Sequence, residues 1–209
     1  MMKVDHVASQ PDRAGRHLVR FEDGSSMRLY RQTVEDFGLF RGLELSEDEL
    51  KKLRIAAGEM SAKMRAVRIV SATGVSKKDL QRRLIQKGED PDQAKAAVAW
   101  MEDLQLLDDR KTAEQIVHKC IAKGYGLARA KQALYEKQIP KDYWQDVLED
   151  YPDQAEHIVR FLRSKLATAT DTKTVSKAIE ALLRRGHSYS VIKRCLNQMS
   201  VDTDTFPEE

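Results

Sequence analysis

The sequence is poor in cysteine, aromatic residues and long apolar runs, and each shortage excludes a class of protein. Two cysteines among 209 residues cannot form a disulfide framework, which fits a reducing cytosol. No apolar stretch approaches the roughly 20 residues that a membrane span needs, and the N-terminus lacks the apolar run of a signal peptide. Aromatic residues make up only 6%, so a core must consist mainly of aliphatic side chains. We therefore expect a cytoplasmic protein without a membrane partner.

Patterns that carry catalysis or metal binding are also missing. The five histidines are scattered, without the paired spacing of a metal site. The sequence contains no Walker loop and no dinucleotide-binding glycine motif. A net charge of +3 is too small by itself to indicate a nucleic-acid-binding protein. We expect a protein that is not an enzyme and that carries no cofactor and no metal.

The first 58 residues predict a small β structure followed by a short helix. In "RHLVRFEDGSSMRLY", apolar and polar residues alternate on both sides of Asp23-Gly24, which indicates a β-hairpin. The turn is either a two-residue type I′ turn or a longer loop that includes the two serines. In "LSEDELKKL", Ser46 and Glu49 have the spacing of a capping box, which predicts the start of a helix.

Most of the remaining chain is a repeat of amphipathic helices. The segment Leu80–Met101 recurs twice, with a third amphipathic helix before each copy: about Met60–Ala72, Arg110–Ala122 and Gln154–Leu166. The shared positions of the second helix are Leu80, Leu84, Lys87 and Gly88, then Ala130, Leu134, Lys137 and Gln138, then Ala178, Leu182, Arg185 and Gly186. The sequence therefore predicts a mainly α protein of three tandem three-helix repeats, residues 59–108, 109–152 and 153–200, before an acidic tail at 201–209.

The join between the first two repeats is the stretch "LLDD". We expect Leu106 and Leu107 to close the core of the first repeat. Asp108 or Asp109 then caps the next helix, where a negative charge also favours the positive end of the helix dipole. Neighbouring repeats are expected to stack, because a unit of this size buries too little apolar surface alone.

The repeats resemble the RecX family of RecA regulators. The resemblance is carried by a helix that ends in Lys-Gly at Lys87-Gly88, by the join "QLLDD", by "AEQIV" after it, and by "KGYG" at Lys123–Gly126. It covers residues 61–151 well and the third repeat loosely. The family pattern has "KGI" where this chain has "KQI", so Gln138 either adopts the helix-ending conformation usual for glycine or the helix ends differently.

The resemblance implies an elongated, curved helical protein that binds RecA. Family members dock in the groove of the RecA filament on single-stranded DNA, and they modulate its ATP hydrolysis, strand exchange and co-protease activity, usually by inhibition. It implies RecA and this filament as partners. Apart from the resemblance, the basic residues described next could add weak direct binding to DNA. We expect the protein to be a monomer.

Basic residues supply the candidate partner-binding surface. The third repeat has a large excess of basic over acidic residues, and Lys87, Lys137 and Arg185 occupy one register of the repeats. Such a face could meet phosphates or an acidic protein surface. The candidates are Arg82, Arg83, Lys87, Arg129, Lys131, Lys137, Arg163, Lys165, Arg184, Arg185, Lys193 and Arg194.

Two other interpretations of these residues remain open. Basic side chains near a helix C-terminus also stabilise the helix dipole, and charged faces are commonly only solvated. The chain could instead be a helical protein that binds DNA directly, since short helix pairs with basic faces can enter a groove. It could also be a helical scaffold. The salt dependence of binding to naked DNA separates the second interpretation from the first.

Overall fold

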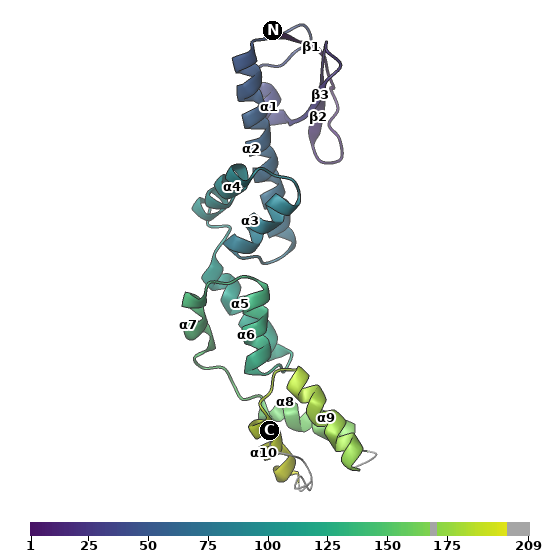
Figure 1. Cartoon of the computed structure of the whole chain (residues 1–209), viewed down its shortest axis with the longest axis vertical. Helices are drawn as coiled ribbons and strands as arrows, with labels where there is room; N and C mark the ends of the chain where they lie inside the picture. The colour runs from purple at the N-terminus through teal and green to yellow at the C-terminus, as the bar shows by residue number, and fades with distance from the viewer. Residues whose placement is uncertain (168–170, 200–209) are drawn as a thin grey trace. The chain divides into compact units, whose positions relative to one another are not determined.

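The computed structural model describes residues 1–167 and 171–199 and is mainly helical (Figure 1). It consists of two compact units, Met1–Leu107 and Asp108–Glu209. The first unit holds a small sheet and the first helical repeat, and the second holds two further repeats. The acidic tail predicted at 201–209 lies outside the described residues.

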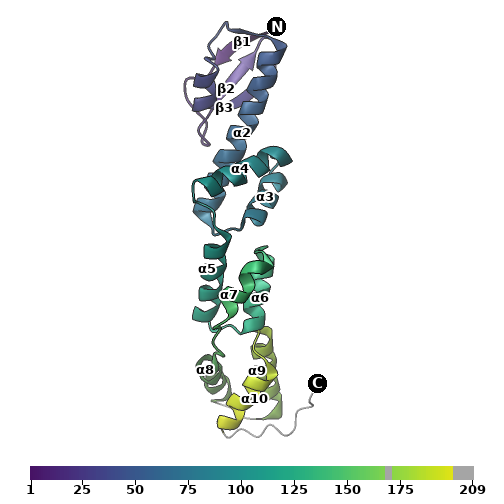
Figure 2. The same ribbon diagram turned by 90° about the vertical axis from the view of Figure 1, so that its left-hand side faces the viewer.

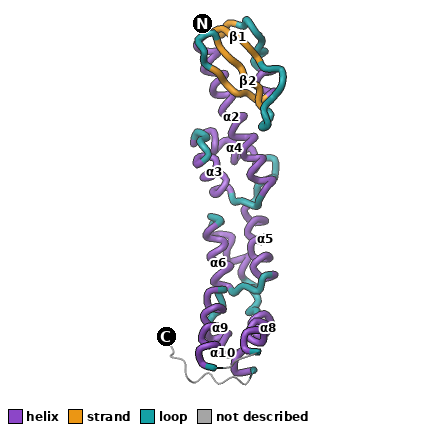
Figure 3. The backbone as a smooth tube through the Cα atoms, turned by 90° about the vertical axis from the view of Figure 1, so that its right-hand side faces the viewer, coloured by secondary structure: helices purple, strands orange, loops and turns teal. Residues whose placement is uncertain are grey.

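The N-terminal sheet has four antiparallel strands in the order β3-β2-β1-β4. Figure 3 draws the strands in orange and the helices in purple. The strands are β1 Met2–Val7, β2 Arg16–Phe21, β3 Ser26–Tyr30 and β4 Glu44–Leu45. The predicted hairpin is confirmed as the β2–β3 pair. Its turn is the longer alternative, because only Gly24 has a positive φ (83°) and the Phe21 amide donates to the Ser25 carbonyl at 2.9 Å. The sequence did not predict β1, whose pairing with β2 shifts register between Val4 and His6.

The sheet packs on the N-terminal half of one long helix. Helix α2 spans Glu47–Ala72, and α1 is the short helix Arg31–Asp36. Figures 1 and 2 show the strands and α1 beside the start of α2. The core of this region combines buried residues of the strands with Leu53 of α2. The sheet therefore gains the helical support that an isolated hairpin lacks in water.

The predicted start of α2 is confirmed, but the predicted end of a short helix near residue 58 is wrong. Ser46 and Glu49 form both hydrogen bonds of a capping box. The helix then continues through Gly58 to Ala72, so the expected boundary at 58/59 falls inside α2. Gly58 allows close packing, since a Cβ there would lie 2.3 Å from the side-chain oxygen of Gln93. The C-terminal half of α2 is the first helix of repeat 1.

Helices α3 (Lys77–Gln86) and α4 (Pro91–Asp103) complete the first repeat. The core includes Ala66 of α2, Leu84 of α3 and Met101 of α4. At the join, Leu107 is buried as predicted, whereas Leu106 is 54% exposed and does not close the core. The chain turns there in the left-handed conformation at Gln105 (φ 56°), which directs only one of the two leucines inward.

The second unit contains repeats 2 and 3. The elements of repeat 2 are α5 Asp109–Ala122, α6 Leu127–Glu136, the 3-10 helix η1 Lys141–Tyr143 and α7 Trp144–Leu148. Those of repeat 3 are α8 Ala155–Leu166, α9 Thr172–Arg184 and α10 Tyr189–Gln198. Asp108 caps α5 by accepting a hydrogen bond from the Lys111 amide at 3.0 Å, one of the two predicted caps. Helix α7 is shorter than predicted and has no side-chain cap, unlike α4 and α10, which begin after Asp90 and Ser188.

The repeat register predicted from the sequence is confirmed by burial. The second helices of the repeats are α3, α6 and α9, and their shared inward positions are at most 4% exposed: Leu80, Leu84, Ala130, Leu134, Ala178 and Leu182. Each helix ends at a left-handed residue, Gly88 (φ 88°), Gln138 (φ 54°) and Gly186 (φ 85°). Gln138 thus adopts the conformation usual for glycine, at a steric cost of about 1–2 kcal/mol.

Repeats 2 and 3 meet at a close backbone contact. The Gly126 amide donates to the Arg185 carbonyl at 3.0 Å, and the Ala128 amide donates to the Gly186 carbonyl at 3.2 Å. A Cβ at Gly126 would lie 2.0 Å from the Gly186 carbonyl oxygen, and a Cβ at Gly186 would lie 2.3 Å from the Arg129 nitrogen. We call this contact the glycine seam. It gives the "KGYG" motif a structural role, because the second glycine lets the two repeats approach.

A buried histidine, His187, adds a side-chain hydrogen bond beside the glycine seam. The Nε2–H of His187 donates to the Gly124 carbonyl at 3.0 Å, and the residue is 6% exposed. Burial lowers the pKa of His187, and the nearby charges of Arg185 and His157 act in the same direction. The hydrogen bond to Gly124 acts the other way, but the net effect is a lowered pKa, so the fold disfavours protonation of the imidazole.

Substitution of Gly126 by alanine tests the glycine seam. The backbone at Gly126 has an ordinary φ of −78°, so the added methyl group acts only through its clash with the Gly186 carbonyl. We expect Gly126→Ala to lower the free energy of unfolding by about 1–3 kcal/mol, as for other overpacked sites. Urea unfolding followed by circular dichroism measures this loss. A control is Ala96→Gly, an exposed site in the interior of α4, which should cost about 1 kcal/mol from helix propensity alone.

The seam also predicts a dependence of stability on pH. The pKa of His187 is lower in the folded protein than its ordinary value of 6.5. Below that value the unfolded chain binds a proton that the folded chain excludes, so the free energy of unfolding falls as the pH drops. We expect His187→Asn, which does not titrate, to lose less stability than the parent between pH 7.5 and 5.5. Equal losses in urea unfolding at the two pH values would contradict this role.

Candidate partner-binding surface

The basic residues predicted on the first repeat divide into two groups. Arg82 and Arg83 hold Asp79, whose side chain is fully buried in the first turn of α3. Arg82 donates a hydrogen bond to one carboxylate oxygen, and Arg83 lies 3.0 Å from the other as an ion pair. Lys87 follows the end of α3 and is exposed. Arg82 and Arg83 therefore have a structural task, whereas the side chain of Lys87 faces solvent.

The candidates on the second repeat lie along α6 and at its end. Arg129 forms an ion pair with Glu136 at 3.2 Å. Lys131 is exposed on α6. Lys137 follows the last residue of α6 and is half-buried. Its position matches that of Lys87 after α3, as the repeat register predicts.

The candidates on the third repeat have several different neighbours. Lys165 and Arg185 both lie over the ring of Phe161, at 5.8 Å and 4.7 Å from its centre. Such cation–π contacts are worth about 0.5–1 kcal/mol at exposed sites. Arg163 of α8 is exposed, and Lys193 of α10 is half-buried.

Acidic partners reduce the free positive charge of the third repeat. Arg184 pairs with Glu180 at 3.7 Å, and Arg194 donates a hydrogen bond to Asp153. Asp153 lies two residues before α8, at the start of the third repeat. Arg184, Arg185 and Arg194 thus contact α9, α8 and the segment before α8.

A set of exposed apolar residues shares the register of the basic ones. Ile85, Tyr135 and Leu183 are 40%, 67% and 43% exposed. Each directly follows the buried leucine of the second helix and precedes the basic residue Lys87, Lys137 or Arg185 by two positions. We call these residues the apolar–basic pairs: Ile85/Lys87, Tyr135/Lys137 and Leu183/Arg185. The sequence shows an apolar residue at the same position in every repeat. That this residue faces solvent follows only from its exposed surface in the structure.

Other chemistry is scarce in the part of the chain that the structure describes. No group of three or more His, Cys, Asp or Glu residues could hold a metal ion there. Within the same residues, no helix is both long and apolar enough to cross a membrane. Both cysteines are buried, and burial raises the pKa of Cys120 and of Cys195. A raised pKa disfavours the thiolate, which is the nucleophilic form of cysteine.

These features define the class of protein as a helical-repeat protein with a small N-terminal sheet. No protein-family model matches the chain. Two solved structures have similar folds: a regulatory protein RecX (TM-score 0.63, 20% identity, 94% of this chain and 100% of that one) and RecX from Lactobacillus salivarius (TM-score 0.59, 22% identity, 70% and 99%).

Sequence relatives carry the same name. The chain is 24% identical over 208 residues to regulatory protein RecX of Clostridioides difficile, covering 94% of each chain. It is 28% identical over 147 residues to regulatory protein RecX of Herbaspirillum seropedicae, covering 69% of this chain and 95% of the relative. In sequence and in fold, the chain is thus similar to regulatory proteins named RecX.

The structural task of Arg82 and Arg83 leads to a prediction of stability. Replacing both by alanine leaves the carboxylate of Asp79 buried without a cationic partner, which typically costs about 3–5 kcal/mol. We expect Arg82→Ala/Arg83→Ala to unfold at a correspondingly lower urea concentration. Adding Asp79→Asn removes the orphaned charge and should recover a large part of the loss. Wild-type stability of the double variant would show that the two arginines are free for a partner.

Proposed function

We propose that this protein binds RecA and the RecA filament on single-stranded DNA, and that it inhibits ATP hydrolysis, strand exchange and co-protease activity of the filament. It would thereby act in DNA recombination, repair and the SOS response. RecA is the partner that the resemblance to the RecX family implies. We also propose that the protein acts in the cytoplasm by binding alone, without catalysis or a cofactor, and as a monomer.

The apolar–basic pairs are the observation that supports this proposal best. A filament presents the same surface many times, so a protein of tandem repeats can meet it with the same residues several times. Each repeat carries one exposed apolar side chain and one basic side chain at matched positions of its second helix. Apolar anchors beside cations are typical of binding surfaces, in which a few side chains carry most of the free energy. Several weak contacts of this kind then give a higher overall affinity, because the binding of one repeat raises the effective concentration of the next repeat at the filament.

Direct binding to DNA remains the second candidate. The basic residues that support it are Lys87, Lys131 and Arg163, all of which are exposed. The matched positions of the apolar residues in the three repeats, however, fit a partner that presents the same protein surface repeatedly. We therefore rank DNA below RecA as the main partner of the apolar–basic pairs.

The test is RecA ATPase activity on single-stranded DNA with this protein titrated in. The informative variant is Ile85→Gln/Tyr135→Gln/Leu183→Gln, which removes the exposed apolar side chains and keeps good helix formers. We expect the concentration for half-maximal inhibition to rise at least about tenfold, which corresponds to about 1.4 kcal/mol of binding free energy. The fold should survive, because none of the three side chains is buried.

The matched control is Phe40→Gln/Ile55→Gln/Leu104→Gln. These residues are 61%, 56% and 48% exposed, and they lie outside the register of the second helices. We expect the control to inhibit RecA like the parent. Equal inhibition by parent and both variants would rule out the apolar–basic pairs. Binding of the parent to naked DNA, with a steep salt dependence and no effect on RecA, would favour the second candidate.

A further inference from the structure

A basic pocket lies in the first unit, between the N-terminal sheet and the first repeat. It has a volume of about 460 Å³, within the range of about 300–1,000 Å³ that is typical of ligand pockets. Five cationic side chains line it: Arg16 of β2, Arg65 and Arg68 of α2, Arg83 of α3, and Lys87. Among the described residues that line the pocket, none is acidic. Only Arg83 and Lys87 of these five were predicted as partner-binding residues.

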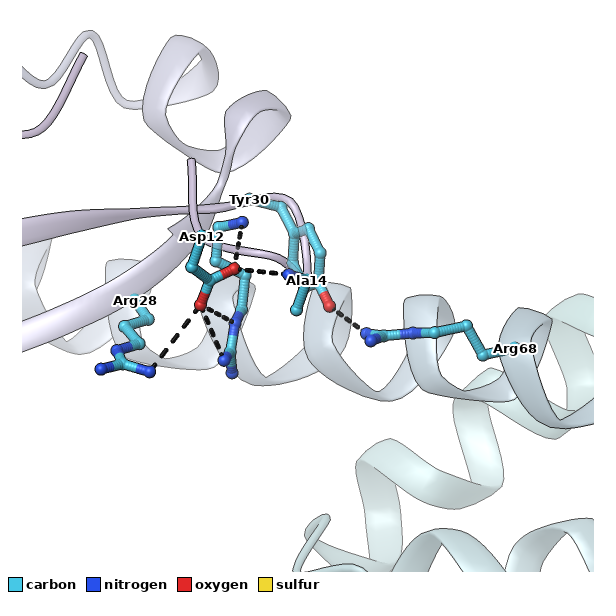
Figure 4. A network of polar contacts seen from close by, with 6 residues as sticks. Asp12, Ala14, Arg28, Tyr30 and Arg68 are labelled. Atoms are coloured by element: carbon cyan, nitrogen blue, oxygen red, sulfur yellow. Dashed lines mark hydrogen bonds and ion pairs between the residues drawn. The ribbon is translucent and has the colours of Figure 1, made fainter. Parts of the chain in front are cut away.

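Two carboxylates that do not line the pocket, those of Asp12 and Glu89, form ion pairs with two of its arginines. Asp12 accepts two hydrogen bonds from the Arg16 guanidinium, at 3.1 Å and 2.9 Å (Figure 4). Hydrogen bonds from the Arg16 backbone and side chain hold the pKa of Asp12 at about 2, so this carboxylate stays charged. Glu89, whose side chain is only 6% exposed, pairs with Arg65 at 2.7 Å.

The arginines are held by polar groups yet remain accessible. Arg68 donates a hydrogen bond to the hydroxyl of Tyr30, which links α2 to β3 (Figure 4). The side chains of Arg16, Arg65 and Arg83 keep 30%, 31% and 30% of their surface exposed. An anion that enters the pocket therefore meets guanidinium groups that are already oriented, which lowers the entropic cost of binding.

The lining also has an apolar part. Ile69 and Ala72 of α2 and the ring of Tyr30 contribute to the same pocket as the cations. A ligand that fits both parts carries negative charge next to an uncharged sugar or ring. A nucleotide unit has this composition, with a phosphate for the arginines and a sugar and base for the apolar surface.

We infer that this pocket binds the phosphate backbone of a nucleic-acid strand. Four of the five cations are arginines, whose planar guanidinium groups match phosphate geometry with paired donors. Neighbouring phosphates of one strand can bind different cationic side chains of the pocket at the same time. A polyacidic chain such as poly-glutamate offers carboxylates but no sugar or ring beside each charge, so it uses only part of the lining. This site is independent of RecA, and its test needs no RecA.

The test is the affinity of the full chain for a fluorescently labelled 20-nucleotide thymidine strand, measured by anisotropy over a range of salt concentrations. In the variant Arg68→Gln/Lys87→Gln, two pocket cations are removed while the ion pairs of Arg16 and Arg65 remain. We expect the affinity at low salt to fall at least about tenfold. The slope of log affinity against log salt should become shallower by about 1.4, since a single strand contributes roughly 0.7 for each phosphate contact.

The matched control is Lys51→Gln/Lys52→Gln, which removes the same charge from exposed positions of α2 away from the pocket. It should bind like the parent, and the charge-preserving variant Arg68→Lys/Lys87→Arg should retain most of the affinity. Three results would overturn the inference: no measurable binding by the parent, equal losses in the pocket and control variants, or competition by poly-glutamate as strong as by unlabelled thymidine strand. Circular dichroism establishes that each variant is folded.

Discussion

The left-handed turn after the second helix of each repeat is the constraint on which the rest of the structure depends. The chain must reverse there to bring the third helix back onto the core, and it does so at Gly88, Gln138 and Gly186. The turn fixes the residues just before it in relation to the buried leucine. As a result, one apolar and one basic side chain reach solvent at the same place in every repeat. At Gly186, the same turn forms half of the glycine seam and thereby joins repeats 2 and 3.

Much of this fold could be predicted from the sequence, because helical periodicity depends on near neighbours. The buried positions of α3, α6 and α9, the caps at Ser46 and Asp108, and the hairpin around Gly24 all follow from local patterns. The end of the short helix expected near residue 58 is wrong, because Gly58 lies inside α2. A glycine that ends a helix and a glycine that admits a neighbouring helix look alike in the sequence. Only the contact with Gln93 distinguishes them.

The candidate surface was harder to predict, because it depends on contacts between distant residues. The count of basic residues did not show that Asp79 engages Arg82 and Arg83, or that Asp153 engages Arg194. It also missed Arg65 and Arg68, which approach Arg16 only once the sheet packs on α2. The structure thus distinguishes two kinds of basic residue in the first unit. Some neutralise buried carboxylates, and others, such as Lys87, remain available to a ligand.

The central claim is that equivalent residues of successive repeats contact equivalent surfaces of successive RecA subunits. The most direct measurement places a photo-crosslinking amino acid at position 85, 135 or 183, one at a time, and maps the crosslinked peptide of RecA in filaments on single-stranded DNA. The account predicts that all three positions crosslink to RecA and that they label the same RecA peptide. Crosslinks from a single position, or to three unrelated peptides, would contradict it.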